Sequence, residues 1–312
     1  MISSFFDKTK PITFVVVLVF LAIFFVLSQI FLTTSDFTPA FLVKKTVVFA
    51  ILALSVFLVD FISKRNRLTG ANAFPMAFFV LLLVMFPRDL TDDNVIICNF
   101  FLLLAIRRVI SIRSLRNVRL KIFDATLWIL VSSLFYHWSL LFMIGVFVAI
   151  YIYEPKKLGN WVVPLSAFGT FALIGVALAI LLGDVGLLTA RYHFSLPRDV
   201  DTLFAWDEAS KYLAYGFLVI CCIFISLLRM GKAGLGKLVT MRLMAFFFFV
   251  AVAVKLMIAV DTTGATIFSF FPAAVFFTNV LVAIKRKNIR EAIFIGFVVL
   301  APIIFMSVYL KW

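Results

Sequence analysis

Long apolar runs alternate with short polar segments along the whole chain, and this alternation predicts membrane-spanning helices. A run of about 20 apolar residues crosses about 30 Å of hydrocarbon as an α-helix. Nine runs are expected to form single spans, and they cover residues 11–33, 46–62, 73–87, 94–106, 161–182, 212–228, 243–260, 266–284 and 292–310. Residues 123–153 carry cations at both ends, which predicts a helical hairpin with its tip near His137. The pattern predicts one all-α polytopic domain over residues 1–312, with about eleven spans in a range of roughly nine to twelve.

Charged residues between the apolar runs set the expected orientation. Residues 107–121 are rich in Lys and Arg, whereas the turn at the other end of the preceding run holds Asp89, Asp92 and Asp93. Because cations near a span stay in the cytoplasm, the basic segment and the N-terminus are predicted to be cytoplasmic and the acidic turn external. Residues 183–211 form the longest predicted external loop. The expected location is therefore the cell inner membrane, as a multi-pass protein.

The runs on either side of the acidic turn are short for a full crossing. Residues 73–87 and 94–106, like each arm of the hairpin, fall below the about 20 residues that a bilayer requires. The acidic turn is therefore expected to lie in a recess rather than in bulk water.

Composition supports the membrane class and removes several others. The chain is 64% hydrophobic, contains 40 Phe in 312 residues and has a mean hydropathy of +1.16, which exceeds what a soluble fold can bury. The net charge of +14 comes from cations that separate apolar runs, so a nucleic-acid partner is not expected. The three cysteines lie inside apolar runs, and two histidines are too few for an oxygenase built on several histidine ligands.

Carboxylates on the external side are the sharpest candidates for chemistry. Asp36 follows the first predicted span, and Asp92 with Asp93 follows the third. In a shared cavity, a carboxylate would act as general base on an acceptor hydroxyl, or would bind a divalent cation that neutralises a leaving lipid phosphate. The alternative is that external loops are simply polar and tolerate acids.

Four further residues are candidates for substrate binding. Arg191, His193 and Arg198, in the long external loop, are suited to grip a phosphate. His137 lies at the hairpin tip between two aromatic residues, where an interfacial anchor is the competing interpretation.

Other charged groups near the spans have structural interpretations. Lys255 is expected to extend its ammonium group to the outer interface. Asp60 and Asp124, at the cytoplasmic ends of their spans, are expected to form ion pairs with Lys64 and Lys121.

Two resemblances extend these expectations. An acid after the first span, an acid pair after the third and a helix returning through FLLLAIRRVISI are similar to the N-terminal module of the GT-C membrane glycosyltransferases, over roughly the first half of the chain. That resemblance implies sugar transfer from a polyprenyl-phosphate donor, with Asp36 as base and Asp92 or Asp93 as the second acid. The segments MISSFFDKTKPITF, ICNFFLLLAIRRVISI and KIFDATLWILVSSLFYHWSLLF resemble a Bacteroidota family of polytopic inner-membrane proteins, a domain of unknown function.

The first functional expectation is thus a GT-C-like glycosyltransferase that uses a polyprenyl-phosphate-linked sugar in cell-envelope glycan or glycoprotein assembly. A non-enzymatic membrane subunit or scaffold with envelope protein partners is a second possibility. A transporter of a lipid-linked precursor is a third. Membrane lipids are expected partners in every case, and a divalent cation is the one cofactor under consideration.

Overall fold

The computed structural model describes residues 5–7, 10–33, 38–183, 206–230, 235–257 and 265–309, and over these ranges the chain is almost entirely helical, without strands. The α-helices are α2 (Pro11–Leu32), α3 (Pro39–Arg65), α4 (Phe74–Met85), α5 (Asp93–Ser111), α6 (Val118–Ser133), α7 (Met143–Tyr153), α8 (Leu158–Leu182), α10 (Trp206–Met230), α11 (Leu235–Leu256), α12 (Phe270–Val282) and α13 (Lys287–Tyr309). Four short 3₁₀ helices accompany them, η1 (Pro87–Leu90), η2 (Ile112–Ser114), η3 (His137–Phe142) and η5 (Ala265–Ser269). The predicted all-α class is confirmed for the described residues.

Each predicted apolar segment corresponds to an α-helix in the described part of the chain, and residues 123–153 divide into α6 and α7. Among the described residues, eight helical segments are long and apolar enough to cross a membrane. By contrast, α4, α6 and α7 have 12, 16 and 11 residues, which fits the expected short arms. Helix α10 already begins at Trp206, inside the predicted external loop 183–211. The number of crossings and their direction stay predictions.

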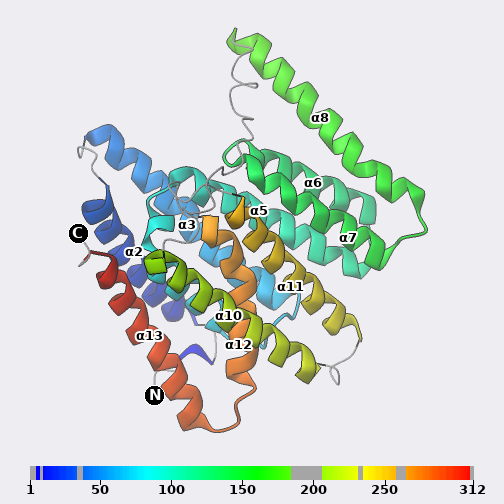
Figure 1. Ribbon diagram of the computed structural model, residues 1–312. Helices are drawn as coiled ribbons and strands as arrows, with labels where there is room; N and C mark the ends of the chain where they lie inside the picture. The colour runs from blue at the N-terminus through cyan, green and yellow to red at the C-terminus, as the bar shows by residue number, and fades with distance from the viewer. Residues whose placement is uncertain are drawn as a thin grey trace.

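Helices α4 and α12 form the centre of the bundle. Eleven of the 12 residues of α4 are buried, as are 83% of residues 265–282, and the two helices pack against each other. Their contact is aromatic, with ring centroids 5.7 Å apart for Phe78 and Phe277 and 6.5 Å apart for Phe79 and Phe270. Helices α3 and α13 pack on α4, while α10 and α11 pack on α12 (Figure 1). Apolar packing therefore fixes the centre.

The peripheral helices keep apolar faces that no other described helix covers. Only 17% of the apolar stretch of α8 is buried, and this helix lies along α6, well apart from α2 and α13 (Figure 1). The corresponding buried shares of α2, α10 and α13 are 28%, 22% and 17%. Helices that are apolar on all sides yet little buried have the surface that hydrocarbon chains solvate. The described residues thus have the build of a multi-pass membrane protein.

Ion pairs hold the basic end of the bundle. Lys64 Nζ lies 2.6 Å from Asp60 Oδ2, as expected. The prediction that Asp124 pairs with Lys121 was wrong. Asp124 pairs with Arg108 at 2.9 Å, and Lys121 donates hydrogen bonds to the turn around η2. Helices α5 and α6 pack side by side, so the long Arg108 side chain crosses to Asp124. Lys121 instead satisfies oxygens left open where α5 ends.

Helix α7 approaches α11 closely at Gly145. A Cβ atom at this position would overlap the ring of Phe247, which is fully buried and stacks on Phe142 with centroids 6.0 Å apart. The ring has little room to move because its other neighbours are packed against it. The missing side chain at Gly145 therefore sets the distance between α7 and α11.

Replacing Gly145 with alanine is expected to lower the free energy of unfolding by about 1–3 kcal/mol, the usual cost of overpacking a core. Thermal unfolding of the detergent-solubilised protein measures the change. Gly169→Ala, in α8, is the matched control because an added Cβ there would meet no described atom within 4 Å beyond the local backbone of its own helix. That variant should gain about 0.5 kcal/mol through helix propensity. Equal effects at both positions would contradict the close approach of α7 and α11.

Candidate functional site

Three 3₁₀ helices gather at one end of the bundle. Each lies at the end of a half-length helix, η1 after α4, η3 before α7 and η5 before α12. η5 packs against η1, α5 and α11, and η3 packs against α5 and α11. We name this region the Asp89 junction after its buried carboxylate, and it includes Asp89, Tyr215, Lys255 and Ser269. Chain segments that are far apart in sequence therefore bring polar side chains together here.

Asp89 is enclosed in this junction, with 1% of its surface exposed. No side chain of the described residues donates a hydrogen bond to its carboxylate, which faces the backbone N–H groups of Thr266 and Ile267 at the start of η5. Burial raises the pKa of the Asp89 carboxyl well above its ordinary value, while the charge of Lys255 and the backbone N–H of Thr266 act in the opposite direction. A carboxyl with a strongly perturbed pKa and a specific cation nearby is typical of functional sites.

Aromatic rings surround the junction. The Lys255 ammonium lies over the ring of Tyr212, 4.9 Å from its centroid, and Tyr212 stacks on Phe86 at 5.5 Å. The hydroxyl groups of Tyr215 and Ser269 are 2.8 Å apart and share a hydrogen bond. Lys255 therefore lies on the ring of Tyr212 and within the electrostatic field of the Asp89 carboxylate. The expectation that its ammonium group extends to the outer interface did not include these two contacts.

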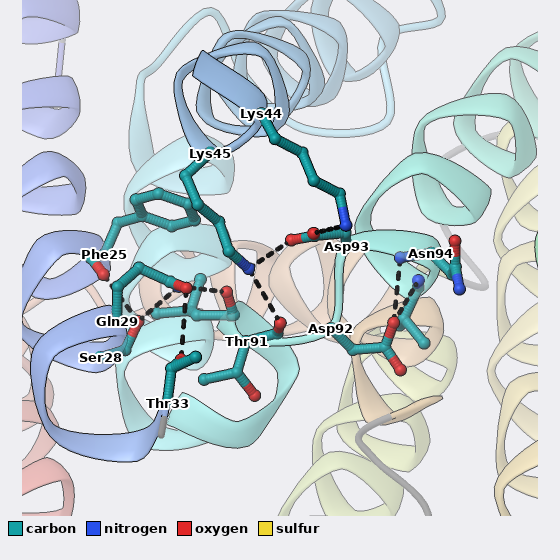
Figure 2. A network of polar contacts seen from close by, with 12 residues as sticks. Phe25, Ser28, Gln29, Thr33, Lys44, Lys45, Thr91, Asp92, Asp93 and Asn94 are labelled. Atoms are coloured by element: carbon teal, nitrogen blue, oxygen red, sulfur yellow. Dashed lines mark hydrogen bonds and ion pairs between the residues drawn. The ribbon is translucent and has the colours of Figure 1, made fainter. Parts of the chain in front are cut away.

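Asp93 does not face a cavity as a free carboxylate. Its two oxygens pair with lysines of α3, with Lys45 Nζ 2.6 Å from Oδ1 and Lys44 Nζ 2.9 Å from Oδ2 (Figure 2). Lys45 also donates to the backbone carbonyl of Thr91 at 3.3 Å. The side chains of Lys45 and Asp93 are only 10% and 11% exposed. This ion pair ties α5 and the acidic turn to α3.

Asp92 begins α5 as its N-cap. Its Oδ1 accepts hydrogen bonds from the backbone N–H groups of Asn94 at 2.9 Å and Val95 at 3.2 Å (Figure 2). These bonds satisfy donors that the first turn of a helix leaves open. From α2, Gln29 Nε2 donates to the carbonyl of Leu90 at 2.9 Å. The acidic turn is thus sheltered, as predicted, and held from α2, α3 and α5.

The remaining candidates divide into two groups. Asp36, Arg191, His193 and Arg198 lie outside the described residues. His137 opens η3, half-buried, with its ring centroid 6.0 Å from that of Tyr136 and 5.6 Å from that of Trp138.

The hairpin tip belongs to the same end of the bundle as the acidic turn. The ring of Tyr136 meets that of Phe268, in η5, at a centroid distance of 5.5 Å. The structure therefore places Asp92, Asp93 and His137 at one end, around η5, but assigns the first two to structural contacts.

Asp89 was noted in the acidic turn but was not among the predicted site residues. Its signal in the sequence is its position directly after an apolar run, within Pro87–Leu90. Among the described residues, no three His, Cys, Asp or Glu side chains gather as metal ligands.

No family model matches the chain, and no curated protein or solved structure matches it. Function is therefore inferred from the geometry of the Asp89 junction.

Replacing Asp93 with asparagine is expected to lower the free energy of unfolding by about 3 kcal/mol, because Lys45 would stay buried without its counter-charge. Lys44→Met is the matched control, since the Lys44 side chain is 66% exposed and its pair should contribute at most about 0.5 kcal/mol. Chemical denaturation in detergent measures both changes. Similar losses for the two variants would show that the Lys45–Asp93 pair is solvated.

The raised pKa of Asp89 predicts a pH-dependent stability. The folded protein holds the Asp89 proton more tightly than the unfolded chain does, so this group lowers stability as pH rises from about 4 through its native pKa. Asp89→Asn, which is neutral at all pH values, removes that contribution. The variant should exceed the wild type in melting temperature at pH 7, and the difference should shrink toward pH 4. A melting-temperature difference that grows at acidic pH would contradict the raised pKa of Asp89.

Proposed function

We propose that this chain is a multi-pass inner-membrane protein that transfers a sugar from a polyprenyl-phosphate-linked donor, with its reaction centre at the Asp89 junction. The proposal includes eleven spans, a cytoplasmic N-terminus and a GT-C-like arrangement with the acidic turn external. The observation that supports it most is a fully buried carboxylate that no described side chain hydrogen-bonds, within the field of Lys255. Such a group costs stability, which favours a functional reason for its position.

The proposed chemistry uses Asp89 and Lys255. The Asp89 carboxylate would accept the proton of an acceptor hydroxyl while the hydroxyl oxygen attacks the anomeric carbon of the sugar. The bond between that carbon and the phosphate oxygen would break, and the polyprenyl phosphate would leave with the electron pair. Lys255 would stabilise the charge on the departing phosphate. A raised pKa makes Asp89 a stronger base once it is ionised.

Substrate access places a condition on this mechanism. Asp89 is covered in the described structure, and η5 packs directly on η1. Reaction therefore requires η5 to move away from η1. The resemblance to GT-C enzymes implies Asp36 as the base, so Asp36 and Asp89 are tested together.

A non-enzymatic subunit or scaffold is the second candidate. The observation that favours it is the structural use of the acid pair, because Asp92 caps α5 and Asp93 binds two lysines. In that case the end of the bundle that holds the acidic turn would contact envelope protein partners rather than a donor lipid.

The test compares Asp36→Asn, Asp89→Asn and Asp92→Asn in membrane vesicles that contain the cell's own lipid-linked sugars. Loss of a general base is expected to slow sugar transfer at least about 100-fold with unchanged protein levels. Asp124→Asn, at the opposite end of the bundle, is the control for loss of a carboxylate. We expect Asp89→Asn to abolish transfer and Asp92→Asn to retain it.

Complementation of a deletion strain separates the two candidates. If Asp36→Asn and Asp89→Asn both complement fully at normal protein levels, the enzyme is excluded and the scaffold stands. If Asp89→Asn complements and Asp36→Asn does not, Asp89 is not the general base.

A further inference from the structure

An apolar groove lies between α4, α10, α12 and α13, and we name it the α10 groove. Its volume is about 250 Å³, and its apolar lining includes Leu82, Leu218, Phe277 and Phe297. Lys211 is its charged lining residue; the others are apolar or aromatic. The lining therefore combines a long hydrophobic surface with one cation.

The cation lies at one end of the groove. Lys211 is near the start of α10, and Leu218, farther along the same helix, is about 10 Å deeper at 1.5 Å per residue. Phe86 borders the groove where α4 ends, whereas Phe277 is in the middle of α12. The groove thus runs from a charged mouth, at the end that holds the acidic turn, toward the apolar middle of the bundle.

The groove opens through the lipid-facing side of the bundle. Only 22% of the apolar stretch of α10 and 17% of that of α13 are buried, and these helices form two of its walls. Ala214 and Leu218 line the groove and are exposed. Hydrocarbon chains of a surrounding bilayer would therefore have direct access to it.

We propose that the α10 groove binds an anionic phospholipid, with one acyl chain in the groove and the phosphate at the ammonium group of Lys211. The volume is below the 300–1,000 Å³ typical of pockets for drug-sized molecules, and it accommodates part of a single chain. A lysine at a membrane surface attracts anionic headgroups. This site is independent of the proposed sugar transfer, since it needs neither Asp89 nor a donor lipid.

The bound lipid would also support the Asp89 junction. Phe86 and Tyr215 line the groove on one side. On the other side, the carbonyl of Phe86 accepts from the Asp89 N–H at 3.1 Å, and Tyr215 shares its hydrogen bond with Ser269. A chain packed against these rings restrains the same residues that enclose Asp89. Binding to the folded state alone raises stability by mass action.

The experiment uses the full-length protein, purified in detergent and stripped of lipid. Native mass spectrometry measures binding of phosphatidylglycerol, phosphatidylcholine and undecaprenyl phosphate, and thermal unfolding reports the stabilisation. We expect phosphatidylglycerol to bind most tightly and to raise the melting temperature. Ala214→Trp fills the groove from an exposed position and should weaken binding about tenfold. Ala172→Trp, exposed on α8, is the matched control and should bind like the wild type.

The headgroup contact is tested separately. Lys211→Gln should weaken phosphatidylglycerol binding about fivefold, while Lys211→Arg should preserve it. Equal binding of phosphatidylcholine, or unchanged binding by Ala214→Trp, would overturn the proposal. Tighter binding of undecaprenyl phosphate than of phosphatidylglycerol would overturn it as well, because the occupant would then be a different lipid.

Discussion

A helix that ends within a bilayer must have its open backbone groups satisfied by protein, and much of this structure follows from that requirement. The helices α4, α7 and α12 are too short to cross alone. Their ends continue into η1, η3 and η5, which pack together or on shared neighbours. Polar side chains from the longer helices then supply hydrogen bonds, as Gln29 does for Leu90 and Lys45 does for Thr91. The position of Gln29, a polar residue within an apolar run, is thereby explained.

The same requirement distinguishes the carboxylates of the acidic turn from one another. Asp92 satisfies backbone donors of α5, and Asp93 offsets the charges of Lys44 and Lys45, so both stabilise the turn. Asp89 lies instead against the backbone N–H groups of Thr266 and Ile267 and within the field of Lys255. It is buried at an energetic cost that the ammonium group of Lys255 only partly offsets. Asp89 is therefore the carboxylate of the turn with the largest uncompensated cost of burial, and it is the one at which we propose chemistry.

Sequence reasoning predicted the helices well because their signal is local. Apolar runs, their lengths and the shortness of the segments around the acidic turn are all visible in the printed chain. Side-chain partners were harder because they depend on how helices cross. Arg108, and not Lys121, meets Asp124, and Lys45 reaches Asp93 from 48 residues away. Three aspartates within five positions look alike in sequence, and only their place on η1 or α5 separates them.

Lysines near the acidic turn need compensation, because they lie at the end predicted to be external, where the positive-inside rule predicts few cations. Lys44 and Lys45 obtain it from Asp93. Lys255 obtains it from the field of Asp89 and from the ring of Tyr212. Lys211 precedes that tyrosine in the chain and borders a groove that opens to hydrocarbon. A lipid phosphate would be its counter-charge in the groove that we propose, so the proposed reaction centre and the proposed lipid site answer one electrostatic requirement.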